Sequence, residues 1–130
     1  MSDYSEIRLN YMIKRYQDLS YWQKSMDLVD QIYTLIRQLP ENERNCLCDQ
    51  MQRAAISIPS NIAEGYDRGS RQEYAHFLTI ARASKSELET QLFICIRQGY
   101  FTKEQVAIAL ALCEEIGRML TAAITKLKSN

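Results

Sequence analysis

Apolar residues in this chain recur at intervals of three and four along four separate stretches, and this spacing constrains the fold more than any other feature. Residues spaced in this way share one face of an α-helix, so each stretch predicts a helix with one buried side. The four stretches are residues 20–39, 41–65, 70–98 and 102–127. In the first of them, the main apolar stripe is formed by Trp22, Ser25, Met26, Val29, Ile32, Tyr33 and Ile36.

Start and stop signals separate these stretches. Ser20–Gln23, Ser70–Glu73 and Thr102–Gln105 each have the sequence of a capping box, in which two side chains satisfy free N–H groups at the start of a helix. Pro40 ends the first stretch because the residue before a proline is disfavoured in the helical conformation. Gly65 is predicted to end the second helix, since glycine adopts the left-handed conformation of a C-terminal stop without strain.

The pattern predicts an all-α protein, an up-down-up-down antiparallel four-helix bundle. Short connections between helices make neighbours antiparallel. The chain has 130 residues with only 4 Gly and 2 Pro, too few for the many turns of an all-β fold. We assign the bundle to residues 20–130 and treat residues 1–19, whose apolar residues keep no clean period, as an N-terminal arm.

Two predicted helices carry a second apolar stripe beside the main one. A helix that buries one face needs a single stripe, and a wider one indicates either a broad core face or a second partner. On the second interpretation these residues form an interface between subunits, because exposed apolar patches on monomers are usually small. The residues are Leu28, Leu35, Ile108, Leu112 and Met119.

Pro59 lies inside the second predicted helix. The apolar pattern keeps its phase from Ile58 to Ile62, and the stop signal at Gly65 comes later. We therefore predict that the helix continues through Pro59 with a kink, which leaves the carbonyl of Ala55 without its usual donor.

Polar residues lie close to the predicted core around this proline. Such groups must be hydrogen-bonded, and a network that fixes the register of two helices would satisfy them. The alternative is a pocket in which two carboxylates, Glu64 and Glu87, bind a cation or activate water. The predicted network comprises Ser57, Ser60, Asn61, Glu64, Ser84, Glu87 and Gln91.

Charge and cysteine content exclude several classes of function. The 16 basic and 16 acidic residues cancel, so any nucleic-acid site must be a local patch. Cys46 and Cys48 lack the usual spacing of zinc ligands, and His76 is the one histidine, so we expect no metal, no cofactor and no catalytic residue. No stretch is apolar enough to span a membrane, and we expect a cytoplasmic protein without disulfides.

Four segments of the chain resemble a known family: Trp22–Leu28, Arg53–Gly65, Ala81–Ser84 and Glu87–Leu92. Together they closely resemble the four-helix-bundle family named for intervening sequences in bacterial 23S ribosomal RNA genes. The similarity covers roughly residues 17–127, and Ser25 departs from the Ala of many relatives. The resemblance implies a homopentamer, a link to RNA because some members are encoded inside ribosomal RNA insertions, and no enzymatic activity.

These observations favour a non-enzymatic oligomeric binding or scaffold protein that is associated with RNA. A protein-interaction adaptor without nucleic acid, and a binder of small molecules or ions near Pro59, are the alternatives. If RNA binds, arginine should dominate the contacts because its fork matches phosphate oxygens. Otherwise the same arginines pair with carboxylates such as Glu64, Glu87 and Glu89. The candidate RNA contacts are Arg53, Arg68, Arg71, Arg82 and Arg97.

Overall fold

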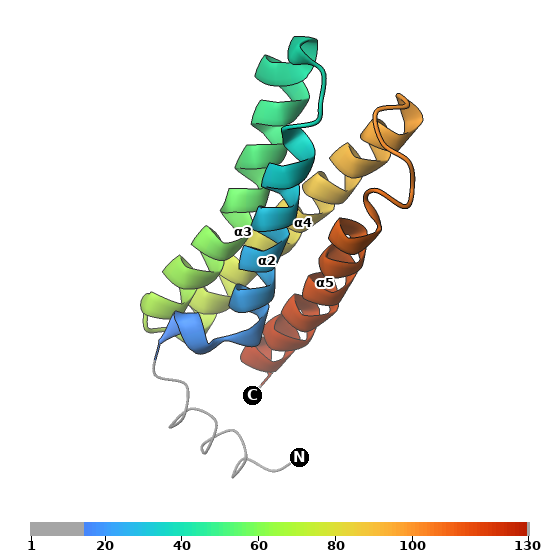
Figure 1. Cartoon of the computed structure of the whole chain (residues 1–130). Coiled ribbons are helices and arrows are strands. Elements are labelled where there is room, and N and C mark those ends of the chain that lie inside the picture. Colours follow the sequence, from blue (N-terminus) through green and yellow to red (C-terminus); the bar gives the residue numbers. More distant parts are fainter. Residues whose placement is uncertain (1–14, 130) are drawn as a thin grey trace.

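The structure, a computed structural model, describes residues 15–129, and that part of the chain is built from helices and the turns between them (Figure 1). A 3₁₀ turn at Tyr16–Asp18 precedes the first long helix, and a 3₁₀ turn at Glu41–Glu43 followed by a π-helical turn at Arg44–Cys48 leads into the second. The four long helices are α2 (Ser20–Ile36), α3 (Asp49–Asp67), α4 (Arg71–Arg97) and α5 (Ala107–Lys128).

The long helices form one bundle in which neighbours along the chain are neighbours in space. α2 packs on α3, α3 on α4 and α4 on α5, and α2 closes the arrangement by packing on α5 (Figure 1). This confirms the predicted all-α, antiparallel four-helix bundle. Of the predicted arm, residues 1–19, the part from 1 to 14 lies outside the described residues. Leu19 is buried against the bundle, and the ring of Tyr16 meets that of Trp22 edge-on at 5.5 Å.

The core-facing side of α2 differs from the predicted one. Leu28 is 0% exposed and Leu35 is also buried, so the prediction that these two residues lie between subunits is wrong. They belong to the true core stripe, whereas Met26 of the predicted stripe is 39% exposed. The two stripes on α2 are both apolar and are displaced by a fraction of a turn, so periodicity alone does not show which one meets the other helices. The buried residues of α2 are Tyr21, Ser25, Leu28, Ile32 and Leu35.

Of the three predicted capping boxes, the one at Thr102 forms in full and the one at Ser70 forms only its N-cap bond. The Ser70 hydroxyl accepts a hydrogen bond from the Glu73 amide (3.1 Å) at the start of α4. Thr102 and Gln105 exchange two bonds, of 2.8 and 3.2 Å, although the chain makes one further turn before α5 begins at Ala107. The prediction for Ser20 is wrong: the residue before α2 is Leu19, and no side chain caps the first turn.

Gly65 does not end the second helix, contrary to prediction. α3 continues to Asp67, and the glycine with a positive φ in the connection to α4 is Gly69 (φ 86°). Gly65 is buried where α3 crosses α4, and a Cβ atom there would lie 2.5 Å from the Cβ of Phe77. The glycine thus permits close approach of two helices and is not a stop signal.

α3 runs through Pro59 without interruption, which confirms the prediction that the helix does not end there. Pro59 itself is buried, and Ile58 and Ile62 on either side of it are both fully buried in the core. The Asn61 amide, two residues after the proline, donates to the Ser57 carbonyl (2.8 Å).

None of the helices in residues 15–129 is both long and apolar enough to cross a membrane. All four cysteines are free thiols; Cys95 and Cys113 are buried in the core, and Cys46 is exposed. Burial raises the pKa of the Cys95 thiol to about 11 and that of the Cys113 thiol to about 12. Because a thiol reacts as its thiolate, these two core cysteines are not suited to act as nucleophiles at neutral pH.

Candidate functional site

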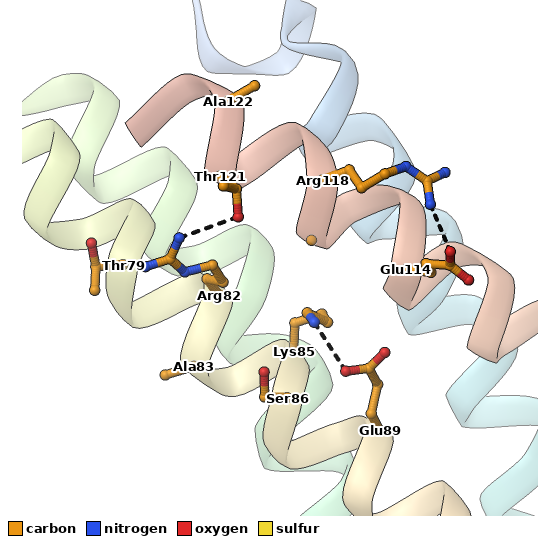
Figure 2. Close-up of a pocket in the computed structure, with 11 residues that line it drawn as sticks. Thr79, Arg82, Ala83, Lys85, Ser86, Glu89, Glu114, Arg118, Thr121 and Ala122 are labelled. Carbon is orange, nitrogen blue, oxygen red and sulfur yellow. Dashed lines mark hydrogen bonds and ion pairs between the residues drawn. The ribbon is translucent and has the colours of Figure 1, made fainter. Parts of the chain in front are cut away.

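A groove of about 680 Å³ runs between α4 and α5, and its walls carry both charged and hydroxyl side chains (Figure 2). α4 contributes Arg82, Lys85 and Glu89, together with the hydroxyls of Thr79 and Ser86. α5 contributes Glu114, Gly117, Arg118 and Thr121. Ala83 and Ala122 complete the lining, so the groove combines polar and apolar surface on the facing sides of two helices whose other sides are buried in the core.

Lys85 fills the space that Gly117 leaves open. A Cβ atom on Gly117 would lie 2.9 Å from the Lys85 Cε and 3.0 Å from its Nζ, so the absent side chain lets the lysine lie across α5. The lysine side chain is only 14% exposed, and its ammonium donates to Glu89 Oε1 at 2.9 Å (Figure 2). A charge this far from water needs such a partner.

Arg82 differs from the other cations of the groove in having no carboxylate partner within residues 15–129. Its guanidinium donates to the Thr121 hydroxyl across the groove at 3.2 Å (Figure 2). Arg118 pairs with Glu114 at 2.8 Å, and Lys85 pairs with Glu89. Three cations and two carboxylates leave one net positive charge in the groove, and Arg82 carries it.

The structure does not bring the predicted arginines together. Arg53 pairs with Asp49 (3.2 Å) and Arg68 pairs with Glu64 (2.8 Å), as the alternative interpretation expects for surface arginines. Arg71 donates to the carbonyls of Lys126 (2.9 Å) and Leu127 (3.4 Å) at the end of α5, which is a capping role. Two candidates have neither an ion pair nor a capping role in residues 15–129: Arg82 in the groove and the exposed Arg97 farther along α4.

The predicted polar network is smaller than expected. The Ser57 and Ser84 hydroxyls are hydrogen-bonded at 2.8 Å, which joins α3 to α4 next to Pro59. The Asn61 amide donates to both the carbonyl (2.8 Å) and the hydroxyl (2.9 Å) of Ser57. These three residues form a closed set that fixes the register of the two helices.

The other four predicted members lie elsewhere, so the prediction of one seven-residue network is wrong. Gln91 donates to Glu87 (3.3 Å) on α4, Glu64 pairs with Arg68, and Ser60 is exposed. α3 and α4 are antiparallel and meet at Ser57 and Ser84, so Glu64 and Glu87 lie on opposite sides of that meeting point. Their separation along the bundle is about 15 Å at 1.5 Å per residue, too far for one pocket.

No group of three His, Cys, Asp or Glu side chains within residues 15–129 could hold a metal ion. Three tyrosines, near the start of α2, the end of α3 and the start of α4, also have a structural role. Tyr21 and Tyr74 share a hydrogen bond between their hydroxyls, and the ring of Tyr66 meets that of Tyr74 edge-on at 5.6 Å. Burial raises the pKa of both Tyr21 and Tyr74, so they stay neutral at physiological pH.

Comparison with known proteins now places the chain. Residues 17–122 match the family described as 23S rRNA-intervening sequence protein. The chain belongs to this family. The crystal structure of a protein of unknown function from the S23 ribosomal protein family of Bacteroides thetaiotaomicron VPI-5482 is similar, with 30% sequence identity and a TM-score of 0.72. The match covers 84% of this chain and 99% of that one.

Membership in the 23S rRNA-intervening sequence protein family confirms the resemblance carried by Arg53–Gly65 and the other three segments. No curated protein matches the chain. Neither the family description nor that of the solved relative names an enzymatic activity, and the relative is described as a protein of unknown function. The function of the groove must therefore be argued from its own chemistry.

Proposed function

We propose that this chain is a non-enzymatic protein that binds RNA through the α4–α5 groove and works as an oligomer. The observation that carries the proposal is Arg82, a groove-lining guanidinium with no carboxylate partner in the described part of the chain, beside the hydroxyls of Thr79, Ser86 and Thr121. A guanidinium and neighbouring hydroxyls are the donors that proteins use for phosphate oxygens. The family description, which refers to an intervening sequence of 23S rRNA, favours RNA as the source of that phosphate.

The balanced charge of the whole chain agrees with a local contact. With 16 basic and 16 acidic residues, the protein has no net field to attract nucleic acid, so binding must depend on few phosphate contacts. Arg118 and Lys85 add to the site only when a phosphate competes with Glu114 and Glu89 for them. We therefore expect weak binding that depends on salt.

Of the two alternatives, a ligand site near Pro59 has the weaker support. The hydroxyls of Ser57 and Ser84 and the amide NH₂ of Asn61 are already engaged in hydrogen bonds, so fewer donors are left for a small molecule or ion. A protein-interaction adaptor without nucleic acid would use surfaces other than the groove cations, and the experiment below separates it from the RNA proposal.

Replacing Arg82 with alanine tests the RNA proposal. Fluorescence anisotropy with a labelled single-stranded RNA of mixed sequence should show binding that weakens as salt rises. Arg82→Ala should weaken that binding and reduce the slope of log K against log salt by about one phosphate contact. Arg53→Ala is the matched control: it removes the same charge from α3, where Arg53 is paired with Asp49. Equal slopes for the two variants, or native binding that does not depend on salt, would contradict the proposal.

An apolar stripe on α5 supports the oligomer. Ile108 is 62% exposed, and Leu112 and Met119, which follow it at helical spacing, are only partly buried. On α2, Leu28 and Leu35 were predicted to lie in the subunit interface but are buried, whereas Met26 is exposed and can contribute to such an interface. Burying Ile108 against another copy would remove apolar surface from water. The number of copies, five, rests on the family resemblance.

Light scattering at micromolar concentration tests the assembly. The native chain should have the mass of five copies, and Ile108→Asp should lower it because a carboxylate cannot be buried there without a partner. Ile56→Asp on α3, also at an exposed isoleucine, is the control for an added charge. A native chain that is monomeric under these conditions would rule out the oligomer.

A further inference from the structure

We infer that the RNA bound by this protein is single-stranded and lies along α4, with a base stacked on Phe93 and phosphates held by Arg82 and Arg97. The inference rests on the proposed function and adds the class of RNA and the residue that reads its unpaired state. It begins from an exposed aromatic ring: the Phe93 side chain is 53% exposed, and among the exposed large apolar residues in 15–129 it is the one aromatic.

Phe93 continues the groove-facing side of α4. Glu89 lines the groove, and Phe93 follows it one helical turn later; Ser86, which also lines the groove, lies two turns before Phe93. Helical spacing therefore places Phe93 in line with the groove toward the C-terminal end of α4. Figure 1 shows this end of α4 projecting beyond the first turn of α5. The Phe93 side chain itself is exposed.

Arg97 follows Phe93 on the same side of α4. The two residues are one turn apart, about 6 Å along the helix, and the Arg97 side chain is exposed with no ion pair in the described part of the chain. Arg82 lies about 16 Å from Phe93 in the other direction along the helix. The side of α4 thus presents a cation, an aromatic ring and a second cation, an arrangement suited to a strand of a few nucleotides.

The acidic residues of the groove agree with this division. Glu89 and Glu114 are paired with Lys85 and Arg118, and they lie between Arg82 and Phe93. Because these ion pairs already engage Lys85 and Arg118, the cations without a carboxylate partner in residues 15–129 lie at the two ends of this side of α4, and the phosphate contacts belong there. The ring of Phe93 then meets a base instead of the backbone.

Stacking on Phe93 selects unpaired bases. In a duplex each base is already stacked between its neighbours, and the A-form major groove is too narrow for side chains to read. A base in a single strand has a free face, and an aromatic ring provides a sequence-tolerant platform for it. The two arginines bind phosphates of any sequence, whereas Phe93 distinguishes a single strand from a duplex.

Phe93→Ala in the full chain tests the inference, with binding measured by anisotropy on one labelled single-stranded RNA and on the same strand annealed to its complement. The variant should bind the single strand about tenfold more weakly, with an unchanged salt slope, because a base contact releases no counterions. Phe93→Trp should retain binding. Ile56→Ala, which truncates an exposed apolar residue on α3, is the matched control and should bind as the native chain does. Arg97→Ala should lower the salt slope by about one contact.

Either of two results would overturn the inference: equal affinity of Phe93→Ala and Ile56→Ala for the single strand, or binding of the duplex as tight as that of the single strand. If either is found while Arg82→Ala still lowers the salt slope, the groove binds RNA but Phe93 does not read a base. If the native chain shows no salt-dependent binding to either RNA, the proposed function fails as well.

Discussion

Leu28→Ala is expected to lower the free energy of unfolding by about 2–5 kcal/mol, the range for truncating a fully buried leucine. Leu28 is 0% exposed and belongs to the stripe of α2 that packs on the other helices, so its removal leaves a cavity. Met26→Ala, on the neighbouring stripe, removes a side chain that is 39% exposed and should change stability much less.

Urea denaturation of the two variants measures this difference. Both should be compared with the native chain at one protein concentration, because assembly of copies adds to apparent stability. A larger loss for Met26→Ala than for Leu28→Ala would mean that the other stripe of α2 faces the core and that the packing described for this helix is incorrect.

Gly65→Ala and Gly117→Ala form a second pair, and we expect them to differ by about 1–3 kcal/mol in the free energy of unfolding. Both replace a buried glycine inside a helix, so both gain the same helix propensity, about 1 kcal/mol. At Gly65 the new Cβ would lie 2.5 Å from the Phe77 Cβ, an atom fixed to its backbone, so α3 and α4 must move apart. At Gly117 it meets the far end of Lys85, which can swing away.

Thermal or urea unfolding of the two alanine variants checks this expectation. Gly65→Ala should be the less stable of the pair, and Gly117→Ala should be close to the native chain or slightly above it. Equal stabilities would show that α3 and α4 can separate at Gly65 without cost. The comparison is informative because the propensity gain cancels between the variants.

Much of the fold could be predicted because it depends on local pattern. The stripe through Ile58 and Ile62 keeps its phase across Pro59, and this phase was enough to predict that α3 continues. The caps at Ser70 and Thr102 involve residues three apart in sequence, so they too can be read directly. Ser20 has the same sequence signature, but Leu19 before it already occupies the position that precedes the helix.

Features that depend on how helices face each other could not be predicted. α2 has two apolar stripes, and only the positions of α3 and α5 decide that Leu28 is inside. Gly65 was predicted to be a stop signal, and Gly117 lies inside the last predicted helix, yet each makes room for a residue of α4. The one signal in the sequence is a glycine in the middle of a strong helical pattern, which often marks a close approach.

The candidate site was predicted only in part for the same reason. Arg82 and Arg97 are among the predicted RNA contacts, but Thr121 and Arg118 reach the groove from α5, and sequence spacing says nothing of how α4 and α5 face each other. The pairing of Arg68 with Glu64 could be read from their spacing of one helical turn. The role of Arg71 as a cap on the end of α5 could not be read from the sequence, because it joins the first residue of α4 to the last turn of α5.

Photocrosslinking tests the central claim, that RNA lies along α4 in the groove, most directly. The native chain would be irradiated with single-stranded RNA at low salt, digested with trypsin, and the nucleotide-bearing peptides identified by mass spectrometry. Cleavage after Lys85 and Arg97 yields the peptide of residues 86–97, which contains Phe93. We predict that crosslinked nucleotide is found mainly on this peptide and that high salt removes it. Crosslinks confined to peptides of α2 or α3, or none on residues 86–97, would contradict the account.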